Sequence, residues 1–253
     1  MAGEGMRIKR EVKAKIKIKI RISICVLSTV CCLLSAIPVS SEENPCLLCH
    51  SRFSVIAKAV HAPLGMGCET CHQPEKGMEH PQQKGSMKLV RDVPALCYGC
   101  HDESKFNGKF VHFPVSMGTC TGCHNPHQSE FSKILISVPP NLCYSCHENK
   151  ATKKYVHAPA ATGQCLTCHN SHVSGNTALL MSPVNKLCTD CHPGHATGIH
   201  ILAGLQGAHP VKGRPDPSRP GRNMSCASCH DPHNSDFPKL MLQKGLCQRC
   251  HKY

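Results

Sequence analysis

The amino-acid sequence predicts a repeat-built fold that is mostly irregular, with short α-helices and little or no β-sheet. The first observation is the composition, because 253 residues include 21 Cys and 19 His but no Trp, four Tyr and six Phe. The second is a short motif of Cys and His that recurs along the chain at similar intervals. The third is the frequency of Gly and Pro, 19 of each, which end helices soon after they begin. Aromatic side chains are usually the largest buried apolar units, so something other than side chains must fill this interior.

The first 41 residues have the pattern of an export signal. Residues 1–21 carry eight Lys or Arg against two Glu, and an uncharged, mostly apolar run over 22–37 leads into Pro38-Val39-Ser40-Ser41. A basic segment, a short apolar segment and a small-residue exit are the parts of a signal peptide. The apolar run is short for a membrane span. We therefore expect cleavage after Ser41, with an uncleaved anchor as the alternative, and exclude residues 1–41 from the fold.

Outside this segment, the 18 remaining cysteines form nine Cys-x-x-Cys pairs, each followed directly by His. C-x-x-C-H is the attachment signature of c-type haem. The two thiols bond to the porphyrin, and the adjacent His is placed to bind the iron as its proximal ligand. The sequence therefore predicts nine covalent haems c, held by Cys46, Cys49 and His50; Cys68, Cys71 and His72; Cys97, Cys100 and His101; Cys120, Cys123 and His124; Cys143, Cys146 and His147; Cys165, Cys168 and His169; Cys188, Cys191 and His192; Cys226, Cys229 and His230; and Cys247, Cys250 and His251.

Two other interpretations of paired cysteines explain less of the pattern. A zinc ribbon combines two pairs into four ligands, and it has no need of His at the same place after every pair. A disulfide framework fits an even number of cysteines in an exported protein, but it leaves the nine histidines unexplained. Haem attachment accounts for both residue types.

The motifs recur with a period that divides the chain into units. First cysteines at positions 46, 97, 143, 188 and 247 lie 51, 46, 45 and 59 residues apart, and a second motif follows 22, 23, 22 or 38 residues after each of the first four. We expect haem pairs in residues 42–96, 97–142, 143–187 and 188–246, and a single terminal haem in 247–253. The fourth pair contains an insertion at 194–222, which is expected to be a surface loop tolerated between repeats.

Positions that correspond between units also agree in sequence. Val60-His61, Val111-His112 and Val156-His157 each precede a second motif, and Asn-Pro-His or a close variant follows at His127, His172 and His233. In these features the sequence resembles the doubled-CxxCH family of multihaem cytochromes c, from Pro45 to His251. The resemblance implies short helices and long loops around a haem array, two His on most irons, and electron transfer. The first unit departs from it with Gln73-Pro74-Glu75.

The histidines outside the motifs are numerous enough to give every haem iron a second, distal ligand. Ten remain after the nine proximal ligands are subtracted, and His200 is the one we do not include among the candidates. A His three residues after a proximal ligand is too near to reach the far face of its own haem, so His127, His172 and His233 are expected to bind neighbouring haems, with His233 also considered for the last one. Nine irons need nine distal ligands, so one of the ten histidines is not needed, and we expect it to be His195, His200 or His209. The candidate distal ligands are His61, His80, His112, His127, His157, His172, His195, His209 and His233.

Net charge argues against a nucleic-acid-binding protein. The formal charge is +13, but residues 1–41 carry eight basic and two acidic residues, so 21 basic and 14 acidic residues remain, a charge of +7. Nine haems would add 18 propionates, which leaves a net charge of about −2 when the irons are oxidised. Lys and Arg are therefore expected to pair with propionates and to guide docking.

These features predict an electron carrier of the periplasm rather than an enzyme, and no residue is expected to be catalytic. The expected partners are redox proteins: an inner-membrane quinol-oxidising complex and, as a further possibility, a porin–cytochrome conduit of the outer membrane. Association with the outer membrane or an extracellular location stays open, and no integral membrane span is expected after cleavage.

Two alternative functions stay open at this point. The first is a reductase of a small nitrogen or sulfur oxyanion, which needs one haem with an open iron position; the 194–222 insertion is where such a site would be sought. The second is a haem filament, in which the unpaired haem at Cys247, Cys250 and His251 would make contact between subunits.

Overall fold

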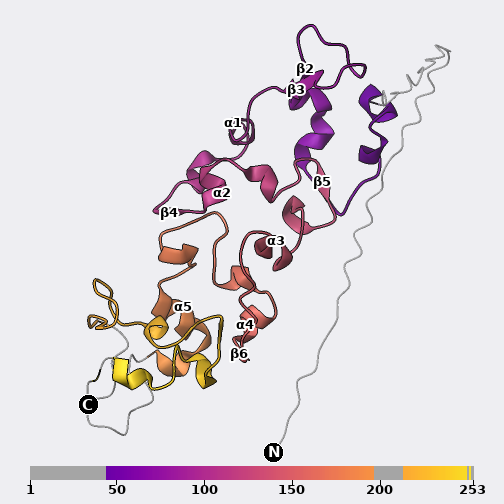
Figure 1. The fold of residues 1–253 in the computed structure, drawn as a ribbon. Helices are drawn as coiled ribbons and strands as arrows, with labels where there is room; N and C mark the ends of the chain where they lie inside the picture. The colour runs from indigo at the N-terminus through magenta and orange to yellow at the C-terminus, as the bar shows by residue number, and fades with distance from the viewer. Residues whose placement is uncertain (1–43, 197–212, 250, 252–253) are drawn as a thin grey trace, which may run out of the picture. The chain divides into compact units, whose positions relative to one another are not determined.

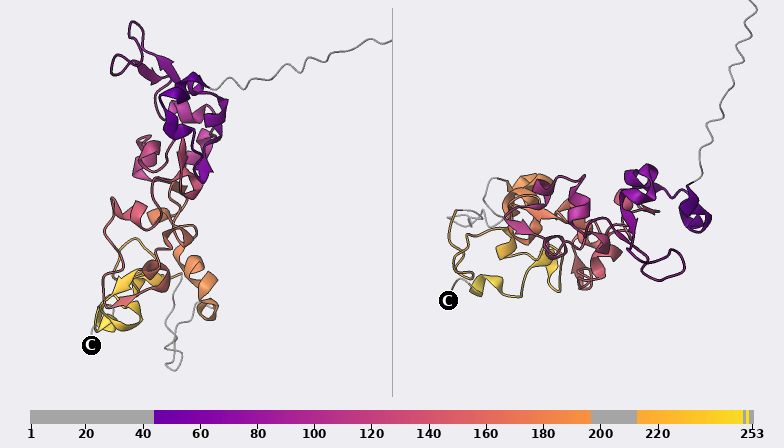
Figure 2. Two further views of the ribbon diagram at one scale, coloured as in Figure 1. Left: turned by 90° about the vertical axis from the view of Figure 1, so that its right-hand side faces the viewer. Right: turned by 90° about the horizontal axis from the view of Figure 1, so that it is seen from above.

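The computed structural model describes residues 44–196, 213–249 and 251. The predicted signal peptide, His200, His209 and much of the 194–222 insertion lie outside these residues. Figure 1 shows short helices and short strands joined by irregular segments. The two further views in Figure 2 likewise show no helix bundle and no layered sheet in the described part.

The α-helices are one or two turns long: α1 (Ala95–Tyr98), α2 (Phe113–Ser116), α3 (Asn141–Tyr144), α4 (Ala158–Ala161) and α5 (Val184–Cys191). Proline stands in the first turn of α2 and α4, where its missing N–H costs no helical hydrogen bond. The remaining helical segments are 3-10 turns: η1 (Pro45–Leu48), η2 (Ser51–Phe53), η3 (Ala62–Met66), η4 (Cys68–Thr70), η5 (Glu103–Phe106), η6 (Cys120–Gly122), η7 (Ser132–Ile134), η8 (Cys165–Thr167), η9 (Thr177–Leu179), η10 (Pro193–His195), η11 (Cys226–Ser228), η12 (Pro238–Leu240) and η13 (Leu246–Arg249).

Each motif lies on or beside one of these turns. The first cysteines of the second, third and fourth units lie in α1, α3 and α5, and η4, η6, η8 and η11 begin at the first cysteine of a second motif. In eight motifs the backbone N–H of the His donates to the carbonyl of the first Cys, at 2.8–3.0 Å. A helical turn places residues three and four apart on one face. The turn therefore brings both thiols and the imidazole of a motif to the same side.

The strands are two or three residues long and form four antiparallel pairs. β2 (His72–Pro74) and β3 (Met87–Leu89) make a local hairpin. The other three pairs join segments distant in sequence: β1 (Ala59–Val60) with β5 (Gln128–Ser129), β4 (Phe110–Val111) with β7 (Val173–Ser174), and β6 (Tyr155–Val156) with β8 (Asn234–Ser235). The predicted fold class is confirmed, and three of the four strand pairs join one repeat to the next.

No apolar side chain is buried among the described residues. Large apolar side chains are instead exposed, including Ile56 at 81%, Leu48 at 78% and Phe113 at 72%. The side chains that are buried are polar ones such as Ser86, Asp216 and Ser228. Folding needs apolar burial to offset the loss of chain entropy. The described chain therefore requires an apolar group that its own side chains do not supply.

No helix within the described residues is long and apolar enough to span a membrane.

Candidate functional site

Seven pairs of histidines face each other across the same gap. Their ring centroids are 6.0 Å apart in six pairs and 6.2 Å apart in the seventh, and their ring planes are within 8–27° of parallel. Each pair joins the His of one C-x-x-C-H motif to a His outside the motifs. The pairs are His50 with His80, His72 with His127, His101 with His61, His124 with His172, His147 with His112, His169 with His233, and His192 with His157.

This separation fits one metal ion between each pair of rings. A metal–imidazole bond is about 2 Å long, and the coordinating nitrogen lies about 1 Å from the ring centre, so two ligands on opposite sides of an ion have centroids about 6 Å apart. Rings in direct van der Waals contact would be closer. The residues present therefore fit a haem iron between two imidazoles, with the neighbouring cysteines placed for attachment.

The pairing follows a regular order along the chain. His61, His112 and His157 each face the proximal His of the next motif but one, which is the first motif of the following unit. The histidines that follow the second motifs face backwards, so His127 faces His72 and His172 faces His124. The second and third units thus each place a His opposite a motif of both neighbouring units.

The small strands hold these outward and returning ligands back to back. The backbone N–H of His61 donates to the carbonyl of His127 at 2.8 Å, directly beside the β1–β5 pair. His112 donates to His172 at 2.8 Å beside β4–β7, and His157 donates to His233 at 2.9 Å beside β6–β8. One hydrogen-bonded pair of residues therefore positions ligands for two different sites.

Backbone carbonyls fix the orientation of the forward-facing ligands. Nδ1 of His61 lies 2.8 Å from the carbonyl oxygen of Pro126, and Nδ1 of His112 lies 2.9 Å from that of Ser171. His157 makes the same contact with Pro232, at 2.9 Å. A carbonyl only accepts a hydrogen bond, so Nδ1 carries the proton and Nε2 keeps its lone pair for a metal. Such partners also raise the basicity of a ligand.

Three proximal histidines are held by strained backbone that the sequence did not indicate. Nδ1 of His124, His169 and His230 donates to the carbonyls of Lys133, Ala178 and Lys239 at 2.8–2.9 Å. Each acceptor has a left-handed conformation, with φ of 54–59°, and none is a Gly. Strain of this kind costs of order 1 kcal/mol or more and concentrates at functional sites. The sequence did not predict this conformation, because nothing in these side chains indicates a positive φ.

Burial keeps the returning ligands uncharged. It lowers the pKa of His127 and of His172, and it also lowers that of His233, where the carboxylate of Asp231 partly opposes the effect. Aromatic rings contribute to this environment. The ring centroids of Phe53 and His127 are 4.7 Å apart, and the ring of Phe106 lies edge-on to that of His172 with the centroids 5.5 Å apart. A neutral imidazole is the form that binds iron.

The two motifs of a unit meet through their first cysteines. The thiol of Cys97 lies beside that of Cys120, and the thiol of Cys143 lies beside that of Cys165. Burial raises the pKa of Cys97 and of Cys143. The same contact joins the first cysteines of the first unit, Cys46 and Cys68, and of the fourth unit, Cys188 and Cys226. In the fourth unit, the hydrogen bond from Cys188 lowers the pKa of Cys226 to about 7.

The arrangement does not favour the two other uses of cysteine. No disulfide joins the described cysteines. In the same part of the chain, no group of three or more His, Cys, Asp or Glu is gathered as a zinc ribbon would require. The ligands come in facing pairs, which suits an ion that is already held in a planar macrocycle.

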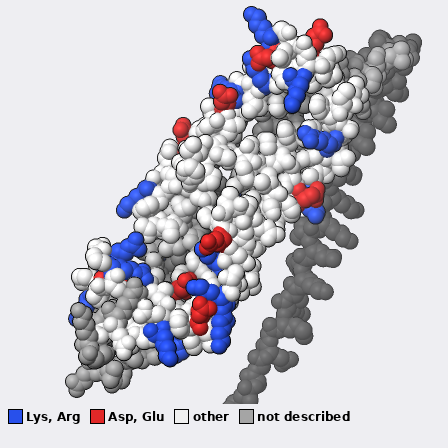
Figure 3. Space-filling model, in the orientation of Figure 1, with Lys and Arg blue, Asp and Glu red and all other residues white. Residues whose placement is uncertain are grey.

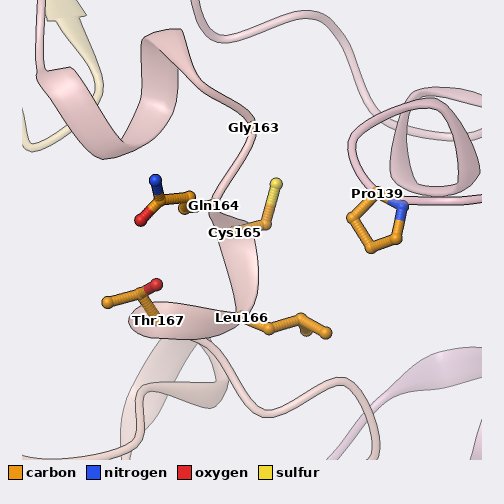
Figure 4. Close-up of a pocket in the computed structure, with 6 residues that line it drawn as sticks. All are labelled: Pro139, Gly163, Gln164, Cys165, Leu166 and Thr167. Carbon is orange, nitrogen blue, oxygen red and sulfur yellow. The ribbon is translucent and has the colours of Figure 1, made fainter. Parts of the chain in front are cut away.

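A glycine before the second motif allows the chain to pass a proline closely. Gly163 has φ +69°, and a Cβ at this position would lie 2.5 Å from Cδ of Pro140. Gly118 occupies the same place in the preceding unit, with φ +68° and Pro94 as its neighbour. Figure 4 shows the open hollow beside this turn, with Pro139 across from Cys165. Glycine precedes the second motif in the first three units, at Gly67, Gly118 and Gly163.

The described end of the insertion is anchored to the eighth motif. Asp216 is only 3% exposed, and the hydroxyl of Ser228 beside it holds the pKa of its carboxyl below the usual range. The guanidinium of Arg219 donates to the carbonyl of Ala227 inside the same motif. Most other residues of 213–222 are exposed, so this end of the insertion lies at the surface and is attached to the C-x-x-C turn through Arg219.

The remaining predicted ligands are less fully placed. His195 lies in η10, and His230 and His251 lie in or next to their motif turns. His233 faces His169, so the suggestion that it serves the last motif at His251 does not hold in the structure. Methionine can also bind haem iron through its thioether sulfur. Met66 and Met117 are 66% and 63% exposed, however, and neither belongs to one of the seven facing pairs, in which both rings are His.

Charged side chains are scattered and mixed in sign on the face shown in Figure 3, where a broad part of the surface is uncharged. Exposed ion pairs such as Lys186–Asp190, at 2.8 Å, and Lys58–Glu130, at 3.6 Å, add little stability. This face therefore presents isolated charges around an array of motifs.

A family model described as the doubled CXXCH motif matches the chain four times, at residues 61–106, 112–152, 157–197 and 219–253. Together the four segments cover more than half of the sequence and contain eight of the nine motifs; the motif at Cys46–His50 lies before the first segment. Each of the first three segments begins at a forward-facing His and includes the motif that this His faces. No curated protein matches the sequence.

Proposed function

Because the chain belongs to the doubled CXXCH motif family of multihaem c-type cytochromes, whose role is electron transfer, we propose that it holds nine covalent haems c and carries electrons through the periplasm. Eighteen cysteines would attach the haems, and the nine motif histidines would be their proximal ligands. The distal ligands are the seven facing histidines, together with two of His195, His200 and His209 for the motifs at His230 and His251.

The observation that carries this proposal is the set of seven facing pairs. A carrier needs irons whose ligands stay in place as the oxidation state changes, and two imidazoles on each iron provide this. Haem supplies one-electron chemistry, at low potential when both axial ligands are His. The residues supply the order, because the first cysteines of the two motifs lie side by side within a unit and histidines contributed by neighbouring units join one unit to the next.

The ligand pairs weaken the case for a reductase. Reduction of a nitrogen or sulfur oxyanion needs an iron with an open or exchangeable position, and seven of the nine proposed irons have a His on each side. The insertion, where such a site was sought, places Arg219 and Asp216 against the eighth motif as structural contacts. The carrier therefore accounts for more of the described residues.

The proposed route runs from an inner-membrane quinol-oxidising complex outward, with a porin–cytochrome conduit as a further partner. The export signal at residues 1–41 supports the periplasmic location, which is also where haem is attached to such motifs. Docking through scattered surface charges suits short-lived contacts with redox partners.

Mass spectrometry of the protein purified from the periplasm tests this proposal. We expect a chain that begins after Ser41 and carries nine haem masses. Fewer than nine haems would show that some motifs are not attachment sites, and zinc or disulfides in their place would contradict the proposal. Reduction by a quinol-oxidising membrane fraction, followed through haem absorbance, tests the direction of electron flow.

A further inference from the structure

The first haem site differs from the other described sites in how its distal ligand is held. His80, which faces His50, lies in the loop of the β2–β3 hairpin, in the same unit as the motif it faces. His61, His112 and His157 instead directly follow strands that are paired with another unit, and the backbone N–H of each donates to the carbonyl of a second facing His. The motif at Cys46–His50 also precedes the first family segment.

The hydrogen bonds of the hairpin loop lie within the hairpin itself. Among the described residues, no hydrogen bond joins residues 75–86 to any residue outside the hairpin, 72–89. The bonds that shape the loop lie within it, such as Glu75 N–H to the Ser86 carbonyl at 2.8 Å. An ion pair of Lys88 with Glu75, at 2.9 Å, closes its base. Figures 1 and 2 show the loop projecting beyond its neighbours.

Exposure separates His80 from the other facing ligands. His80 and His50 are both exposed, whereas the six other distal histidines in facing pairs are half-buried. Ser86 is the one buried residue in the loop, at 2% exposed, and its hydroxyl lies 3.0 Å from Nδ1 of His80. This single hydrogen bond, rather than a strand pair, orients the ring.

From these contacts we infer that His80 is an exchangeable ligand and that the first haem binds small diatomic ligands of ferrous iron, such as carbon monoxide or nitric oxide. Displacing His80 breaks contacts within one exposed loop only. Displacing His61 would also disturb the hydrogen bond between its backbone N–H and the carbonyl of His127. Segments held by few and exposed hydrogen bonds open at the lowest free-energy cost. The inference rests on the proposed bis-histidine haems and adds a ligand-binding function at one end of the array.

Carbon monoxide binding to the dithionite-reduced holoprotein tests the inference. The wild-type protein is expected to bind one equivalent per chain, at a rate limited by loop opening. Ser86→Ala removes the hydrogen bond that holds His80 and should speed this binding roughly three- to tenfold. Ser116→Ala is the matched control, because the Ser116 hydroxyl bonds to the carbonyl of Phe113 and not to a ligand ring; its binding rate should equal that of the wild type.

His80→Ala locates the site. If His80 is the ligand that leaves, this variant binds the same single equivalent without the slow step. A second equivalent in His80→Ala, a wild type that binds none, or a Ser86→Ala rate equal to that of the wild type would each overturn the inference. The haem mass of every sample is measured first, so that a protein with fewer than nine haems counts against the proposed function and not against the role of His80.

Discussion

Each facing pair joins two histidines that are fixed by different means. The proximal residue is set by the single helical turn of its own motif, and the distal residue is set by backbone contacts with another segment. The ring of His124 is oriented by the carbonyl of Lys133, whose backbone is in the left-handed conformation. Burial beside Phe106 lowers the pKa of His172 and so favours its neutral form. Each of these histidines belongs to one facing pair. Replacing the side chain of one of them should therefore affect one iron.

Replacing His172 with Met should alter the fourth haem alone. A thioether ligand favours reduced iron more than imidazole does, so we expect the potential of one haem in nine to rise by roughly 100 mV or more. Potentiometric titration of the haem absorbance would show one centre leaving the low-potential group. Met117→Leu is the control, because Met117 is 63% exposed and is not part of a facing pair; an equal shift in this variant would contradict the assignment.

The turns before the second motifs act at the level of the element. Gly163 links α4 to η8, and its positive φ and its approach to Pro140 leave no room for a side chain. The turn thereby sets where Cys165 lies relative to the preceding motif. Gly118 does the same between α2 and η6, against Pro94.

Gly163→Ala should therefore destabilise the sixth haem site. The left-handed conformation costs a non-glycine residue about 1–2 kcal/mol, and the contact with Pro140 adds to this cost. We expect a lower thermal unfolding temperature and a fraction of chains that lack one haem by mass spectrometry. Gly175→Ala is the matched control, because a Cβ there has nothing within 4 Å. Equal losses in both variants would show that the contact with Pro140 is not the cause.

At the scale of the whole molecule, the proposed ligation means that neighbouring units cannot be separated without loss of ligands. His61 serves the second unit, and His127 returns a ligand to the first. The described residues contain no buried apolar side chain, so the repeats are held by shared sites rather than by a common core. Stability in such a chain is a sum over neighbouring contacts.

Without haem, the mature chain should be largely unfolded. The ordering entropy of the backbone, about 1–2 kcal/mol per residue, then has no apolar burial to offset it. Small-angle scattering of protein made in cells that lack haem attachment should give the dimensions of an expanded chain. A compact particle with native-like dimensions would contradict this account, and the holoprotein measured under the same conditions serves as the reference.

The motifs, their period and the short helices could be predicted from the sequence because each depends on local spacing. His127, His172 and His233 were expected to reach neighbouring sites, and the structure places each of them opposite the proximal His of another motif. The individual partners could not be predicted, because they depend on strand pairs between residues that are 62 to 80 positions apart. The carbonyls of Lys133 and Ala178 were also missed, since a left-handed backbone at these residues has no side-chain signature.

The electron paramagnetic resonance spectrum of the oxidised holoprotein tests the central claim most directly. Two imidazoles on an iron give a low-spin ferric centre, whereas an iron with an open position is high-spin. The seven facing pairs predict at least seven low-spin haems per chain, quantified against the haem content of the same sample. A high-spin signal from more than two haems per chain would contradict the claim that these histidine pairs hold the irons.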